Sequence, residues 1–150
     1  MLLRLEFLWW LFTGILLAVI LFPVLEAVSD YRFLWPNVLF VVTFVTLTRY
    51  IFLLPHTFLA HRQILKIALM ILCIPFVFVL ISHLNTFQTF LDENGPEALV
   101  GDIPFPRNNH LASYIRSELL LFGVGSVIAA ILFAGRMMMS VWRVHNRGTV

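Results

Sequence analysis

The sequence predicts an all-α membrane protein with four transmembrane helices in an up-down-up-down bundle, and three observations lead to that class. The composition is too apolar for a soluble domain, because 61% of the 150 residues are hydrophobic and only 12% are charged, against about 25% charged residues in soluble domains. Four apolar runs are each long enough to cross a bilayer. The charged residues are divided unevenly between the two sides of these runs.

The first two helices are predicted over about residues 5–25 and 37–54. A helix needs about 20 apolar residues to cross the roughly 30 Å of hydrocarbon in a bilayer, and both runs come close to that length. Pro36 and Pro55 bound the second run, and proline disfavours a continuing helix because it lacks the backbone N–H. Lipid does not tolerate unpaired backbone groups, so helices are the expected structure for such runs.

The third and fourth helices are predicted over about residues 64–84 and 117–139. Between them lies the only long connection, residues 85–116, which we expect to form an external loop. Phe87, Phe90 and Leu91 within this loop are spaced to lie on one face of a short helix. An amphipathic helix of this kind is typical of a segment that lies in the membrane interface.

The other two connections are short, covering about residues 26–36 and 55–63. Short links join antiparallel neighbours, so we expect the first helix to pack as a hairpin with the second, and the second with the third. No internal repeat or change in composition divides the chain. Residues 1–150 are therefore predicted to form a single four-span domain.

The charge distribution predicts the orientation. With the spans placed as above, seven of the eight carboxylates fall on one side and seven of the ten Lys and Arg residues fall on the other. Short loops rich in Lys and Arg stay in the cytoplasm. We therefore predict a multi-pass protein of the plasma (inner) membrane with both termini in the cytoplasm.

Small residues recur in the fourth predicted helix. Small side chains four residues apart let helix backbones approach closely, and close packing drives association where lipid removes the hydrophobic incentive. One interpretation is packing within the same bundle, and the other is contact with a second copy or another membrane subunit. The residues of this predicted packing face are Gly125, Ser126, Ala129, Ala130 and Ala134.

Arg49 lies inside the second predicted helix, where an arginine is costly. Three interpretations are open: a side chain that reaches the headgroups, a structural ion pair, or a role in handling substrate or protons. Glu6 is the only acidic residue expected at the same end of the bundle. We therefore predict an ion pair between Glu6 and Arg49 that joins the first two helices.

A basic rim is predicted on the cytoplasmic side, made of His56, His61, Arg62 and Lys66. Basic residues near an anionic membrane surface attract lipid head groups. We interpret the rim as a solvated edge that can touch anionic lipid, with a specific phosphate or head-group site as the alternative.

The sequence offers no catalytic, cofactor or metal site. The common nucleophile, zinc and phosphate-loop motifs are missing, and the single cysteine, Cys73, excludes an intramolecular disulfide. The net charge is only +2 and its basic residues are scattered, so nucleic-acid binding is not indicated. We predict no cofactor.

By elimination, the most favoured function is a non-catalytic structural or accessory subunit of a larger membrane complex. One alternative is a homo-oligomeric channel or small transporter, although the spans hold few polar residues to line a path. The other is a membrane sensor module that docks a cytoplasmic partner.

Overall fold

The computed structural model describes residues 2–148, with side chains from residue 4, and it is all-helical in this range. Four long apolar helices dominate: α1 (Leu2–Ala27), α2 (Leu34–Leu53), α3 (Gln63–Asn94) and α4 (Arg107–Arg147). Each is long and apolar enough to cross a membrane. The predicted set of four membrane-capable helices is therefore confirmed.

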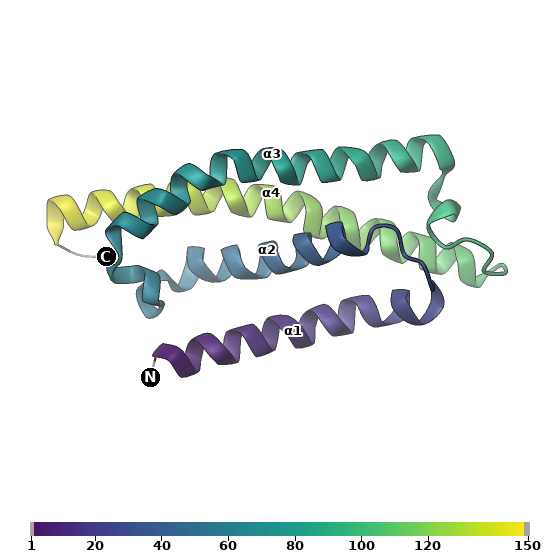
Figure 1. The fold of residues 1–150 in the computed structure, drawn as a ribbon, viewed down its shortest axis with the longest axis horizontal. Helices are drawn as coiled ribbons and strands as arrows, with labels where there is room; N and C mark the ends of the chain where they lie inside the picture. The colour runs from purple at the N-terminus through teal and green to yellow at the C-terminus, as the bar shows by residue number, and fades with distance from the viewer. Residues whose placement is uncertain (1, 149–150) are drawn as a thin grey trace.

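Consecutive helices run in opposite directions, and both ends of the described chain lie at the same end of the molecule (Figure 1). We call this end the termini end. The opposite end, called the loop end, holds the α1–α2 and α3–α4 connections. Two short 3₁₀ turns, η1 (Leu54–His56) and η2 (Phe58–His61), link α2 to α3 at the termini end, and η3 (Pro96–Leu99) lies at the loop end.

The helices are longer than predicted at the loop end. The predicted external loop 85–116 is wrong over most of its length, because α3 continues to Asn94 and α4 begins at Arg107. With 32 and 41 residues, these helices measure about 48 and 62 Å at 1.5 Å per residue. Hydropathy marks only the part of a helix that suits hydrocarbon, whereas helical hydrogen bonding continues until a residue stops it.

The turn residues, in contrast, mark the ends of these helices. Gly95 has φ +77°, a left-handed conformation that glycine adopts without steric cost, and its N–H bonds the Leu91 carbonyl at the end of α3. Pro106 directly precedes α4. The predicted separate interfacial helix around Phe87 is wrong. Phe87 lies in α3, where its side chain is fully buried.

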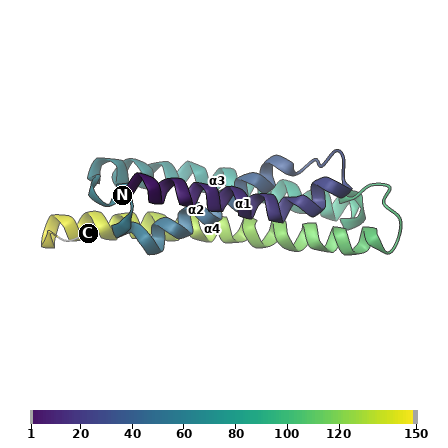
Figure 2. The ribbon, with the colours of Figure 1, turned by 90° about the horizontal axis from the view of Figure 1, so that it is seen from below.

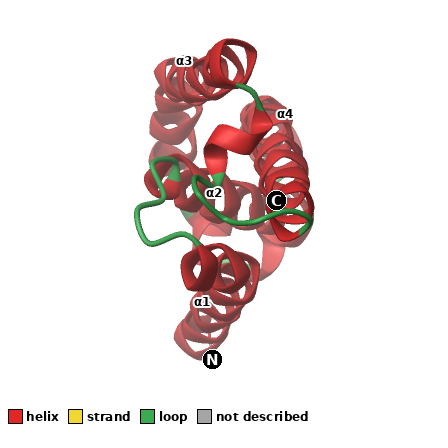
Figure 3. Ribbon diagram, turned by 90° about the vertical axis from the view of Figure 1, so that its right-hand side faces the viewer, coloured by secondary structure: helices red, strands yellow, loops and turns green. Residues whose placement is uncertain are grey.

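The spatial order of the helices differs from the chain order. Figure 1 shows α4 between α2 and α3, with α1 on the far side of α2. Seen from below and along the long axis, the four helices make a flattened, open arrangement (Figures 2 and 3). The predicted hairpin of the second and third helices is wrong, because α2 and α3 both pack chiefly on α4. The η1–η2 segment joins α2 to α3 at the termini end.

Two apolar clusters fill the space around α4. The first lies toward the loop end and includes Phe40 of α2, Phe87 of α3 and Leu119 of α4. The second lies toward the termini end, where Phe133 and Met137 of α4 pack with residues of η1, η2 and α3. The buried interior is therefore built on α4, and α1 contributes little to it.

Candidate functional site

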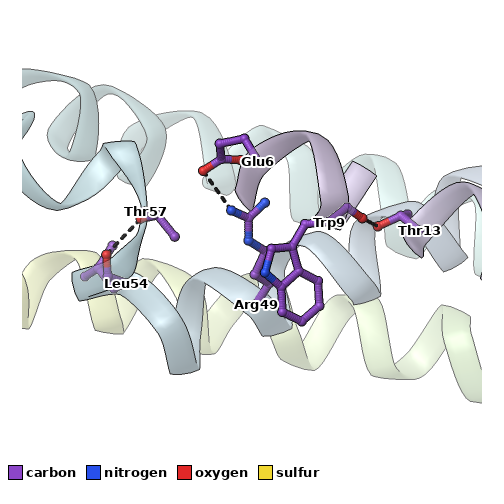
Figure 4. A network of polar contacts seen from close by, with 6 residues as sticks. All are labelled: Glu6, Trp9, Thr13, Arg49, Leu54 and Thr57. Atoms are coloured by element: carbon purple, nitrogen blue, oxygen red, sulfur yellow. Dashed lines mark hydrogen bonds and ion pairs between the residues drawn. The ribbon is translucent and has the colours of Figure 1, made fainter. Parts of the chain in front are cut away.

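The predicted ion pair between Glu6 of α1 and Arg49 of α2 lies at the termini end. Arg49 Nη2 lies 2.7 Å from Glu6 Oε1, and the two side chains are 6% and 15% exposed. Figure 4 shows both side chains between the helices, with Trp9 beside the guanidinium. The Arg49 guanidinium carbon lies 5.4 Å from the ring centres of both Trp9 and Tyr50.

This arrangement neutralises a charge that lipid would otherwise expose. Two aromatic faces interact favourably with the cation, and the carboxylate supplies the opposite charge at hydrogen-bonding distance. Of the three interpretations of Arg49, the structure places the residue in the ion pair. The pair joins α1 to α2, which is a structural role.

The predicted basic rim is only partly on the surface. His56, His61 and Arg62 are exposed, but Lys66 is fully buried. Lys66 Nζ donates to the Ala60 carbonyl over 2.6 Å and to Ser140 Oγ over 2.8 Å.

Lys66 therefore does not belong to an exposed rim. It lies one turn into α3 on the side that faces α4, a direction that spacing along the sequence does not reveal. Its ammonium group instead ties the start of α3 to η2 and α4, where Arg136 Nε likewise donates to the Ile51 carbonyl of α2 over 3.2 Å.

The small-residue face of α4 is occupied within the chain. Ser126, Ala129 and Ala130 are buried. A Cβ built on Gly125 would lie 2.9 Å from ring atoms of Phe44 in α2, closer than real contacts allow. Gly125 therefore lets α2 and α4 approach closely, and the burial of its small neighbours agrees with the first interpretation of their spacing, packing within the bundle.

A second polar cluster lies at the loop end and was not predicted. Asn37, at the start of α2, is fully buried, and its Nδ2 donates to Glu118 Oε2 of α4 over 2.8 Å. The same nitrogen donates to the Tyr31 hydroxyl over 3.3 Å. Burial raises the pKa of the Tyr31 phenol, while the hydrogen bond from Asn37 lowers it and the nearby Glu118 raises it.

Asn37 is the first residue of the predicted span 37–54, and Glu118 is the second residue of the predicted span 117–139. The available signal was their shared depth, since both polar residues fall at the same end of neighbouring apolar runs. Pairing them required knowledge that α2 and α4 are adjacent, which the expected hairpin order did not supply.

The remaining surface features are shallow. A groove of about 580 Å³ at the loop end runs along α3 and is bordered by Arg32, Asn85 and Glu93. The guanidinium carbon of Arg32 lies 5.3 Å from the ring centre of Phe90. Among the described residues, no three His, Cys, Asp or Glu side chains gather closely enough to hold a metal ion.

Comparisons with known proteins add no family to these observations. No protein-family model matches the chain, and neither a curated protein nor a solved structure matches it at a significant level.

Proposed function

We propose that the chain is a non-catalytic accessory subunit of a larger complex in the plasma (inner) membrane, with both termini in the cytoplasm. The observation that carries this proposal is the one-sided packing of α1. This helix packs mainly on α2, and Tyr114 of α4 adds a hydrogen bond from its hydroxyl to the Ile20 carbonyl over 2.7 Å. The rest of its surface is open to lipid or to a partner.

The open side of α1 carries its own small residues. Gly14 and Ala18 are exposed and lie four residues apart, and nothing lies within 4 Å of a Cβ built on Gly14. Small residues at this spacing favour close association of membrane helices. Because the corresponding face of α4 is filled within the chain, we assign the contact with a partner helix to α1.

The alternatives have weaker support. A pore within one chain needs a polar path between helices, but the space around α4 is filled by apolar side chains such as Phe40, Leu80 and Phe133. A homo-oligomeric channel or small transporter would need a path between copies. A sensor that docks a cytoplasmic partner would use the termini end, where α4 extends beyond the other helices (Figure 1).

Anionic lipid is a further proposed partner at the termini end. His61 and Arg62 border a surface pocket of about 740 Å³ at the start of α3, and Phe58 and Ile64 form apolar parts of its wall. A negatively charged head group suits the basic side chains and the N-terminal end of a helix. The acyl chains would then follow the exposed apolar face of α3.

The test is purification of the tagged full-length chain from native membranes in a mild detergent. We expect a stoichiometric membrane partner with the wild type. The double variant Gly14→Leu/Ala18→Leu should lose that partner, because bulky side chains prevent close approach to α1. Gly135→Leu is the matched control, since a Cβ at Gly135 also has nothing within 4 Å, and it should retain the partner.

Two outcomes would contradict the proposal. A monomer that purifies alone in every mild detergent tested would exclude a stable accessory subunit. A homo-oligomer that conducts ions in planar bilayers would support the channel instead.

A further inference from the structure

The Asn37–Glu118 pair leaves two hydrogen-bond acceptors without a donor. Asn37 Oδ1 and Glu118 Oε1 are both buried, and neither has a hydrogen-bond partner. The two oxygens belong to the same two groups that the hydrogen bond from Nδ2 to Oε2 already joins. Buried acceptors without a partner are unfavourable, and a proton on the Glu118 carboxyl would give this pair a further hydrogen-bond donor.

A negative charge on Glu118 would have no counter-ion. Glu118 is 7% exposed, and the ion pair formed by the described residues is the one between Glu6 and Arg49. The phenols of Tyr31 and Tyr114 lie close enough to feel the Glu118 charge, and a phenol carries no positive charge. A buried carboxylate without a partner charge costs many kcal/mol, and such a group takes up a proton instead.

We propose that Glu118 is a proton-binding site whose carboxyl group carries a proton on Oε1 and donates it to Asn37 Oδ1. Asn37 Nδ2 donates in return to Oε2, so the carboxylic acid and the amide form a closed pair with two hydrogen bonds. The second hydrogen on Nδ2 remains available for the Tyr31 hydroxyl, in agreement with the contact between them.

A proton fits this site better than a metal ion does. Hard cations such as Ca²⁺ take about six to eight oxygen ligands, whereas the cluster offers two unpartnered oxygens. The proton also has a structural consequence. It completes the polar contact between the start of α2 and α4, so its release would leave a negative charge facing Asn37 Oδ1 and weaken that contact.

Infrared spectroscopy of the full-length protein in detergent at neutral pH tests the proposal. A protonated carboxyl group has a C=O stretching band that a carboxylate lacks. We expect this band in the wild type, and its shift on ¹³C-labelling of glutamate would assign it to a glutamic acid. Glu118→Gln should lose the band, because glutamine has no carboxyl group. The variant should still fold, because the amide mimics the protonated acid and keeps both hydrogen bonds. Glu26→Gln is the control on an exposed carboxyl and should retain it.

A second variant tests the partner. In Asn37→Leu the acid loses the donor to its C=O group, so the band should move to higher wavenumber without disappearing. A labelled wild type without a glutamic-acid band would overturn the proposal, and a water that donates to both oxygens would then explain the cluster. This wild-type measurement does not depend on any variant folding. It is also independent of the accessory-subunit proposal, since the carboxyl lies inside the chain.

Discussion

Two glutamates lie inside this apolar molecule, and their neighbours differ. Glu6 faces the Arg49 guanidinium at 2.7 Å, so each side chain neutralises the other. Glu118 faces the neutral amide of Asn37. The difference matters because a buried charge is tolerated only with an opposite charge nearby, whereas a buried acid that holds its proton needs only hydrogen bonds.

The ion pair gives a prediction at the residue scale. Glu6→Gln leaves the Arg49 guanidinium buried without a counter-ion, and we expect it to lower the free energy of unfolding by about 3 kcal/mol. Removing both charges, in Glu6→Gln/Arg49→Met, should cost less than Glu6→Gln alone. The measurement is reversible denaturation in detergent micelles.

Glu26→Gln serves as the control for that comparison, because Glu26 is an exposed carboxyl at the other end of α1. It should leave the unfolding free energy close to the wild-type value. The charge swap Glu6→Arg/Arg49→Glu should be more stable than either single reversal. An equally unstable double swap would show that the two side chains do not act as a pair.

At the scale of the elements, α4 organises the molecule because it presents small residues where neighbouring helices come close. A Cβ on Gly125 would lie 2.9 Å from the Phe44 ring of α2, and one on Gly123 would lie 2.8 Å from Leu84 of α3. In lipid there is no hydrophobic driving force between helices, so the van der Waals contacts made at close backbone approach stabilise the packing instead. α1 packs mainly on α2, and its ion pair with Arg49 and the hydrogen bond from Tyr114 add polar contacts.

Glycine replacement tests this packing. Gly125→Leu forces a branched side chain into the Phe44 ring, and overpacking of this kind costs about 1–3 kcal/mol. We expect a corresponding loss in the free energy of unfolding in detergent. Gly135→Leu is matched in helix and in substitution but has open space around the Cβ, so it should have little effect. Equal losses in the two variants would argue against a close α2–α4 contact at Gly125.

At the scale of the whole molecule, the four helices form an open layer with both described ends of the chain together (Figures 1 and 3). An even number of crossings requires the two ends to share one side. The excess of Lys and Arg at the termini end predicts that this side is the cytoplasm. The acid-rich loop end then faces outward.

Cysteine labelling in intact cells tests this orientation. The sequence holds one cysteine, Cys73, so Cys73→Ala provides a background without thiols. In that background, Ala98→Cys at the exposed loop end should react with a membrane-impermeant maleimide from outside. His145→Cys near the end of α4 should react only after the membrane is permeabilised. The reverse pattern would place the termini outside the cell.

The amino-acid pattern alone was enough to predict four membrane-capable helices, but it ended the third about ten residues too early and began the fourth about ten residues too late. Hydropathy and turn chemistry are local properties, so they can be read without knowing which helices touch. The Glu6–Arg49 pair was also predictable, because Glu6 is the only acid expected near Arg49. Chain order failed to predict that α4, and not α3, packs beside α2.

Which neighbours each polar or small residue meets became known from the packing of the helices. The spacing of small residues in α4 is the same whether the facing helix belongs to this chain or to another, so the close approach of Gly125 to Phe44 of α2 could be known only from the structure. Lys66 and the Asn37–Glu118 pair depend in the same way on which side of a helix faces α4. Long-range adjacency is set by side-chain packing across the whole bundle, and no local pattern in the sequence encodes it.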